Sequence, residues 1–245
     1  MDSIPEQDDE LQNTSSCLIL PIIQTFVLKL PAMPSNQPPN NTADNTRARI
    51  LLAAEALFAE QGYAATSVRA IATAANVNLA AAHYHFGSKR GLLVAVIHER
   101  ATPINTHRLQ ALTELESQPS ELQVDAIMVA FFAPFVSGEL SEGFPRVMAR
   151  VFGEPDELIR PIIETEFLPV TRRFIAALHV ALPGLSSDEL AWRFHFVVGA
   201  MLHLVMFSGP LGGGTKASVP SAFQHLQAFV VAGLLDGQQS SIRSS

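Results

Sequence analysis

The sequence has little cysteine, little charge and no long apolar run. A single Cys among 245 residues excludes a disulfide framework and a cysteine-based zinc site, so we expect a reducing compartment, the cytoplasm. Charged residues make up 16% and hydrophobic residues 48%, which argues against a disordered chain. The apolar stretch at residues 17–31 is interrupted by Pro21, Gln24 and Lys29 and is shorter than the ~20 residues of a membrane span. These absences predict a globular protein without a membrane partner.

Catalytic motifs are also missing. The chain has no Ser/His/Asp order, no His-Glu-x-x-His and no paired-carboxylate pattern. Residues 209–216 read G-x-x-x-x-G-T-K, in which the last two positions are reversed from a phosphate-binding loop and follow a predicted helix. We therefore expect neither an enzyme nor a cofactor, and no metal.

The two ends of the chain differ in composition from its middle. Residues 1–45 are acidic at first and then rich in Pro and Asn, which predicts a disordered extension. Met33 is a candidate natural start, with residues 1–32 as an over-extended reading frame or a dispensable arm. Residues 237–245 are expected to form a flexible tail.

The net charge of -7 is unevenly distributed. Residues 1–45 and 101–245 each carry -5, whereas residues 46–100 carry +3. Taken whole, the charge argues against nonspecific nucleic-acid binding, but the basic window suits a polyanion.

Helical periodicity fills the basic window. We predict helices at about 47–61, 67–74 and 79–85 and a fourth from Lys89, with Gly62 ending the first. Asn76 suits the left-handed residue of a sharp turn, and Asn78 is a good N-cap. Two short helices joined by such a turn favour a helix-turn-helix, and an ordinary helical hairpin is the alternative.

The same window carries a family resemblance. Residues 46–100 contain ILLAAEALFAEQGY, TSVRAIATAA, VNLAA and YHFGSK at fixed spacing. They closely resemble the N-terminal domain of the TetR family of transcriptional regulators. The resemblance implies an all-α fold with a DNA-binding domain at 46–103, a helix-turn-helix at 67–86 and a larger effector and dimerisation domain at 104–236.

The resemblance also implies which residues contact DNA. It assigns phosphate contacts to Ser67, with Thr66 beside it, and to Lys89, with Arg90 adjacent. On the third helix it assigns base reading to Leu79, Ala80, Ala81 and His83. It assigns phosphate contact or packing to Tyr84 and His85 on the same helix. The chain departs from the family pattern at His83 and Ala81, so apolar contacts and DNA shape carry part of the specificity. Whether His83 meets a base or a phosphate is open, and one of the two histidines could instead cap or pack.

The C-terminal two thirds also show helical patterns. We predict helices at about 104–117, 121–136, 143–153, 155–182, 186–208 and 219–236. Residues 141–205 resemble the ligand-binding half of the PsrA-like subgroup, which implies a fatty acid or acyl-type effector. The predicted lining residues share large apolar side chains, with one Arg: Phe131, Phe135, Met148, Phe152, Phe174, Phe194 and Arg150. Plain core packing is the alternative for each apolar residue.

Five arginines are candidates for an effector head group: Arg146, Arg150, Arg172, Arg173 and Arg193. The last two predicted helices are apolar over more than one stripe, and the resemblance places a homodimer there. The sequence thus predicts a homodimeric repressor that leaves a palindromic operator in double-stranded DNA when a small lipophilic effector binds. The alternative is a helical ligand-binding or scaffold protein that has lost DNA binding.

Overall fold

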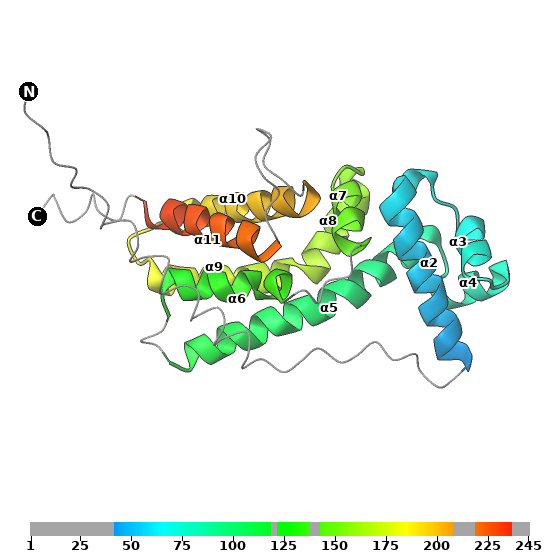
Figure 1. Ribbon diagram of the computed structural model, residues 1–245, viewed down its shortest axis with the longest axis horizontal. Helices are drawn as coiled ribbons and strands as arrows, with labels where there is room; N and C mark the ends of the chain where they lie inside the picture. Colours follow the sequence, from blue (N-terminus) through cyan, green and yellow to red (C-terminus); the bar gives the residue numbers. More distant parts are fainter. Residues whose placement is uncertain (1–41, 119–121, 138–142, 208–218, 237–245) are drawn as a thin grey trace, which may run out of the picture. The chain divides into compact units, whose positions relative to one another are not determined.

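A computed structural model describes residues 42–118, 122–137, 143–207 and 219–236, and every regular element in these ranges is a helix (Figure 1). The predictions for residues 1–41 and 237–245 lie outside this part. None of the helices in these ranges is long and apolar enough to cross a membrane. The helices are α2 (Thr42–Ala65), α3 (Val68–Ala74), α4 (Leu79–Phe86), α5 (Lys89–Glu116), α6 (Val124–Val136), α7 (Gly143–Val151), α8 (Asp156–Glu166), α9 (Leu168–Ala181), α10 (Ser187–Met206) and α11 (Val219–Leu235).

The first described helix starts earlier than its periodicity predicts. It begins at Thr42, within the stretch expected to be disordered, and Asp44 lies in its first turn, where a carboxylate favours the helix dipole. Gly62 interrupts it with a positive φ of 83°, the conformation that glycine adopts most readily. The predicted end of the regular helix near residue 61 is therefore confirmed.

Helix α5 joins two segments that were predicted as separate helices. It runs for 28 residues with Pro103 inside it, so the suggested domain boundary at residue 103 falls within a helix. Proline removes one helical hydrogen bond, but Ile97, Ala101 and Ile104 are buried on one face and hold the two halves in line. Tertiary burial thus overrides the break.

The predicted single helix at 155–182 is wrong, because the chain breaks at Phe167 between α8 and α9. Pro169 lies in the first turn of α9, where its missing N–H costs nothing. A continuous helix would require that N–H and would bring the proline ring against the preceding turn.

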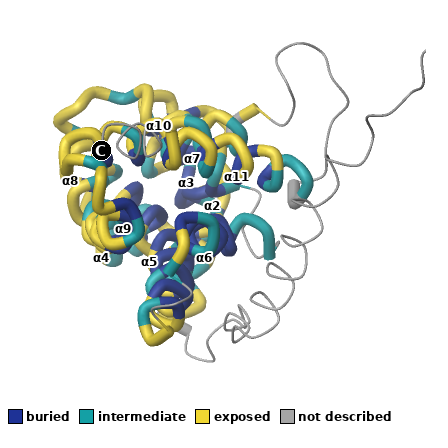
Figure 2. Tube along the Cα trace, turned by 90° about the vertical axis from the view of Figure 1, so that its left-hand side faces the viewer, coloured by how far each residue is buried: buried dark blue, intermediate teal, exposed yellow. Residues whose placement is uncertain are grey.

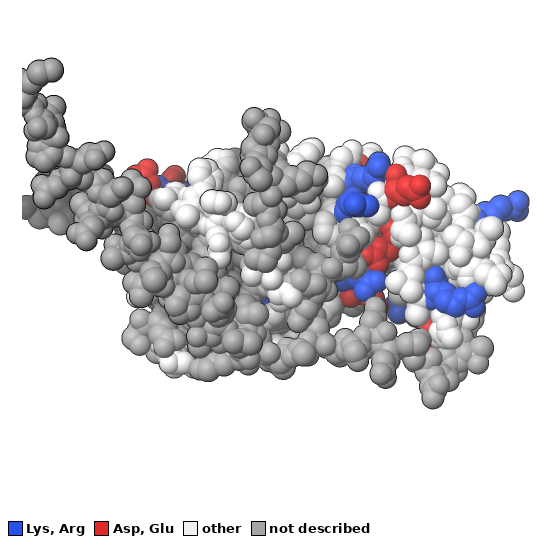
Figure 3. All heavy atoms as spheres, viewed as in Figure 1, with Lys and Arg blue, Asp and Glu red and all other residues white. Residues whose placement is uncertain are grey.

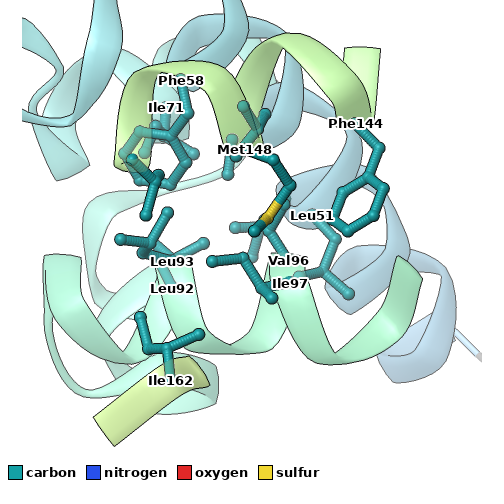
Figure 4. Close-up of a cluster of buried hydrophobic side chains, with 14 of the residues drawn as sticks. Leu51, Phe58, Ile71, Leu92, Leu93, Val96, Ile97, Phe144, Met148 and Ile162 are labelled. Atoms are coloured by element: carbon teal, nitrogen blue, oxygen red, sulfur yellow. The ribbon is translucent and has the colours of Figure 1, made fainter. Parts of the chain in front are cut away.

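Two groups of buried side chains stabilise the described chain. The N-terminal core joins α2, α3, α4 and α5 with residues from α7 and α8, and Figure 4 shows Phe58, Leu93, Ile97 and Met148 within it. Buried residues also follow α5 and α6 in Figure 2. Beside α6 lies a second group, called here the aromatic cluster: Phe131, Phe132, Phe174 and Phe194. Segments from the C-terminal half therefore complete the core beneath the short helices α3 and α4.

Candidate nucleic-acid interface

Local hydrogen bonds define both ends of the helix-turn-helix. The Ser67 hydroxyl accepts from the Ala70 N–H at 3.1 Å, and Asn78 Oδ1 accepts from the Ala81 N–H at 2.7 Å. Asn76 has a φ of 52°, the left-handed conformation that its side chain tolerates. The predicted Asn78 cap and the predicted turn at Asn76 are confirmed.

Packing fixes α4 against the helices beneath it. Ala82 faces inward, and Ile71 and Ala72 of α3 are buried at the same crossing. Arg49 of α2 donates to the carbonyl oxygens of Ala75 and Asn76, at 2.5 and 2.7 Å. This arginine, which the sequence reading did not single out, satisfies two carbonyl groups at the turn and ties it to the first helix.

The opposite face of α4 is open. Tyr84 is 87% exposed, Ala80 and His83 are exposed, and Leu79, Ala81 and His85 are partly covered. His83 Nδ1 lies 3.2 Å from the Gly87 carbonyl oxygen, which can only accept, so this contact requires the proton on Nδ1. Nε2 is then the atom left for an external partner, and in the neutral ring it is an acceptor.

The two adjacent hydroxyl residues differ in position. Ser67 is exposed at the start of α3, where free N–H groups favour an anion. Thr66 is only 2% exposed, and its hydroxyl donates to the Gly62 carbonyl oxygen at 2.7 Å. We therefore assign Thr66 to the packing between α2 and α3 and leave it out of the candidate interface.

Lys89 closes the C-terminal end of α2. Its Nζ donates to the Tyr63 carbonyl oxygen at 2.8 Å and to that of Ala64 at 3.3 Å, and it lies 4.4 Å from the Tyr63 ring centre. An ammonium has three N–H donors, so one remains for a phosphate. Arg90 is exposed and makes no hydrogen bond or ion pair with any residue that the structure describes.

The segment that forms α3, α4 and the first turns of α5 contains no acid. Between Glu60 and Glu99 the sequence has no Asp or Glu, whereas Arg69, Lys89 and Arg90 fall in this interval. Lys and Arg side chains appear on a largely neutral surface at the α3 and α4 end of Figure 3. The uneven charge of the sequence thus becomes a surface suited to an anionic partner.

The structure divides the predicted effector residues into two groups. Phe131, Phe174 and Phe194 are buried together, with ring centres 5.1 Å from Phe131 to each of the other two. Phe135 follows on α6 and stacks on Phe223 of α11. These four form a continuous apolar region.

The other three lie on or just after α7. Met148 belongs to the N-terminal core, in contact with the first helices, as Figure 4 shows. Arg150 donates to the carbonyl oxygens of Ala59 and Glu60 at the end of α2, both at 2.9 Å, and Phe152 is exposed. They therefore do not belong to the region around Phe131.

Arg108 is a buried residue that the sequence reading missed. It follows Ile104 and precedes Leu112 at helical spacing on the buried side of α5. The sequence signal that could have identified it is an arginine at a position of the helix where apolar residues recur. Such a residue indicates a special role, because long charged side chains are rarely fully buried without a partner.

Comparison with known families assigns both parts of the chain. A family described as "Bacterial regulatory proteins, tetR family" matches residues 50–96, and "Tetracyclin repressor-like, C-terminal domain" matches residues 129–233. Together they cover more than half of the sequence. The chain belongs to the TetR family. The resemblance first seen in the helix-turn-helix motifs of this TetR protein is thereby confirmed, together with its all-α fold.

Individual relatives agree with this assignment. The HTH-type transcriptional repressor Rv3405c of Mycobacterium tuberculosis is 34% identical over 106 residues, which are 42% of this chain and 56% of that protein. The match thus spans just over half of that relative. This relative and the family matched at residues 50–96 are both regulators of transcription or regulatory proteins. These matches bear out the expectation that the TetR protein is not an enzyme.

Solved structures share the fold. A TetR-family regulator from Mesorhizobium loti has a TM-score of 0.57 at 20% identity, covering 80% of this chain and 98% of its own. The fatty acid degradation regulator FadR from Bacillus halodurans has a TM-score of 0.55 at 17% identity, covering 76% and 98%.

Proposed function

We propose that the protein is a homodimeric transcriptional repressor that binds palindromic DNA through α4 and leaves it when a lipophilic effector binds. The observation that carries the DNA-binding part is the open face of α4, held by caps at Ser67 and Asn78 within a segment of the chain that has no acidic residue. Such a helix fits the major groove, where His83 Nε2 and the small residues of α4 meet base edges. Ser67, Lys89, Arg90, Tyr84 and His85 are the candidates for phosphate contacts.

An exposed apolar stripe on α10 and α11 supports a dimer. Helix α10 buries Leu190 and Phe194 inside the chain, yet Trp192 is 61% exposed and stacks on the exposed Phe196. Phe229 on the neighbouring α11 is 73% exposed. We call Trp192, Phe196 and Phe229 the outer stripe, and we propose that a second copy covers it, because large contiguous apolar patches are costly in water.

The aromatic cluster supports an apolar effector. Its rings come from α6, α9 and α10, so a bound molecule there touches helices of the proposed dimer face as well. The PsrA-like resemblance and the FadR fold neighbour make a fatty acid or acyl derivative the first class to test.

The proposed route from the effector to the DNA runs through α7, which packs against both α2 and α10, the helix that carries Phe194 of the aromatic cluster. Arg150 of α7 holds the end of α2, and Gly143 lies close to the Glu55 side chain of α2. Glu55 in turn pairs with Arg100 of α5 at 2.7 Å. We propose that effector binding shifts α7 and so changes the spacing of the two recognition helices, which lowers operator affinity.

The direct test is binding of the full chain to duplex DNA from upstream of its own gene, titrated at several salt concentrations. A regulator should bind with an affinity that falls steeply with salt and should prefer that duplex to a scrambled one. Absence of salt-dependent binding would favour the alternative of a scaffold or ligand-binding protein.

Lys89 and Arg90 provide a matched pair for the phosphate contacts. We expect Arg90→Ala to weaken binding about equally for all sequences and to lower the salt slope by roughly one. Lys89→Ala should do the same and also loosen the end of α2, so its loss of affinity should be larger. Fluorescence anisotropy against salt measures both, and a changed base preference in either variant would contradict a phosphate role.

Arg150→Ala tests the proposed route. The variant should bind DNA and effector, but the effector should lower its DNA affinity by a smaller factor than in the wild type, where coupling of about 5- to 150-fold is typical. Arg160→Ala, an exposed arginine of α8 paired with Asp156, is the control. Unchanged coupling in the Arg150 variant would remove this contact from the mechanism.

A further inference from the structure

Arg108 is a charged residue inside the protein. Its side chain is 4% exposed, its Nε donates to the Phe131 carbonyl oxygen at 2.8 Å, and an Nη group lies 3.5 Å from the Met201 sulfur. In the part of the chain that the structure describes, no Asp or Glu forms an ion pair with it. Among the described residues, this buried cation therefore has no carboxylate beside it.

The surroundings of this guanidinium are aromatic. Its central carbon lies 4.1 Å from the ring centre of Phe131 and 5.2 Å from that of Phe135, and Phe174 and Phe194 contact Phe131. Ring faces attract a cation but do not neutralise it. Burial lowers the pKa of Arg108 from its usual value to about 9, because the charged form loses its hydration, and the group still carries its charge at neutral pH.

A buried charge without an opposite charge beside it is strongly unfavourable, so an anionic ligand would stabilise the guanidinium. The thioether of Met201 is a weak acceptor that a stronger one would replace. The planar guanidinium matches a carboxylate with two parallel hydrogen bonds. One turn earlier on α5, the buried Asn105 donates through Nδ2 to the Glu166 carbonyl oxygen at 2.6 Å, and its Oδ1 has no hydrogen-bond partner among the described residues.

The arginines that the sequence suggested for this role are less suitable. Arg150 is used by the end of α2, and Arg173 pairs with Glu116 at 2.6 Å on the surface. Arg193 donates to Glu189 and to carbonyl oxygens at the end of α11. None of these three lies among the rings around Phe131.

We propose that Arg108 binds the carboxylate of an amphipathic, singly charged effector whose hydrocarbon tail packs against Phe131, Phe135 and Phe174. This rests on the proposed function, in which the C-terminal half takes a lipophilic effector, and it makes the effector a free acid. A neutral ester or a coenzyme A thioester of the same chain lacks the carboxylate that Arg108 binds.

The test compares four ligands with one hydrocarbon chain on the full-length protein: decanoate, methyl decanoate, decan-1-ol and decanoyl-coenzyme A. Calorimetric titration at neutral pH should show decanoate binding at least about 10-fold more tightly than the others, as expected for a charge-assisted pair. Arg108→Met should bind the acid and the ester within about threefold of each other. Arg173→Met makes the same substitution at a surface arginine and is the matched control. This variant should still bind the acid more tightly than the ester.

The outcomes separate the two proposals. If the wild type binds the ester or the alcohol as tightly as the acid, the role of Arg108 is overturned and the lipophilic effector stands. Tightest binding of the thioester, or a retained acid preference in Arg108→Met, likewise overturns the role of Arg108. If none of the four binds, the proposed effector class is overturned as well. Should Arg108→Met fail to fold, the wild-type comparison decides alone.

Discussion

Replacing Phe229 by Glu should convert the protein from a dimer to a monomer and lower its operator affinity by about 100-fold or more. The side chain is 73% exposed on α11, the helix that packs against α10, and α10 carries the exposed Trp192 and Phe196. A carboxylate placed there in both copies would be buried without a partner when the dimer forms, which is strongly unfavourable. A monomer also loses the avidity of two linked half-site contacts, which is worth about 10²- to 10⁴-fold.

Sedimentation velocity and DNA titration on the same samples measure this effect. Phe152→Glu is the matched control, since it introduces the same charge at an exposed phenylalanine at the end of α7, outside α10 and α11. It should remain a dimer. A Phe229→Glu variant that stays dimeric would place the interface elsewhere.

Phe58→Ala should destabilise the protein by about 3–5 kcal/mol, the usual cost of removing a fully buried aromatic side chain. Phe58 is 1% exposed in the N-terminal core, and its ring centre lies 5.9 Å from that of Tyr63. Tyr63 in turn supports Lys89 through its ring and its carbonyl oxygen. The cavity should therefore weaken the phosphate-binding end of the interface in addition to the fold.

Thermal unfolding checks the stability change, which corresponds to a fall in Tm of roughly 6–20 °C for a chain of this size. Leu52→Ala on the same helix is the control, because Leu52 is 54% exposed and its loss should change stability by about 0.5 kcal/mol or less. Similar losses in both variants would mean that the N-terminal core is not the main source of stability in this region.

Local signals explain why so much of the helix-turn-helix was predictable. Ser67, Asn76, Asn78 and Gly62 act on their own neighbouring backbone groups, so residue type alone indicates each cap and turn. The same holds for Ser186, whose hydroxyl accepts from the Glu189 N–H at the start of α10. These effects need no knowledge of the rest of the fold.

Other features depend on residues far away in the sequence. Pro103 stays inside a helix, where distant packing buries the residues on either side of it, while Pro169 begins a new helix. Residue type and periodicity do not distinguish the two cases. Thr66 and Ser67 both carry a hydroxyl, but only the packed structure shows that Thr66 faces Gly62. The environment of Arg108 joins Phe131 and Met201, 23 and 93 positions further along the chain.

The motif spacing identified the DNA-binding half more sharply than the ligand-binding half. This follows from their physics, because DNA presents one groove geometry, whereas an apolar interior accommodates many ligands without a fixed motif.

Selection of bound duplexes from random sequence by the full-length protein tests the central claim most directly. We expect enrichment of a two-fold symmetric site whose half-sites are centred about one helical turn apart, and we expect His83→Ala to change the preferred bases within each half. Enrichment of sites without two-fold symmetry, or no enrichment above the unselected pool, would contradict the account of a dimeric repressor that reads DNA through α4.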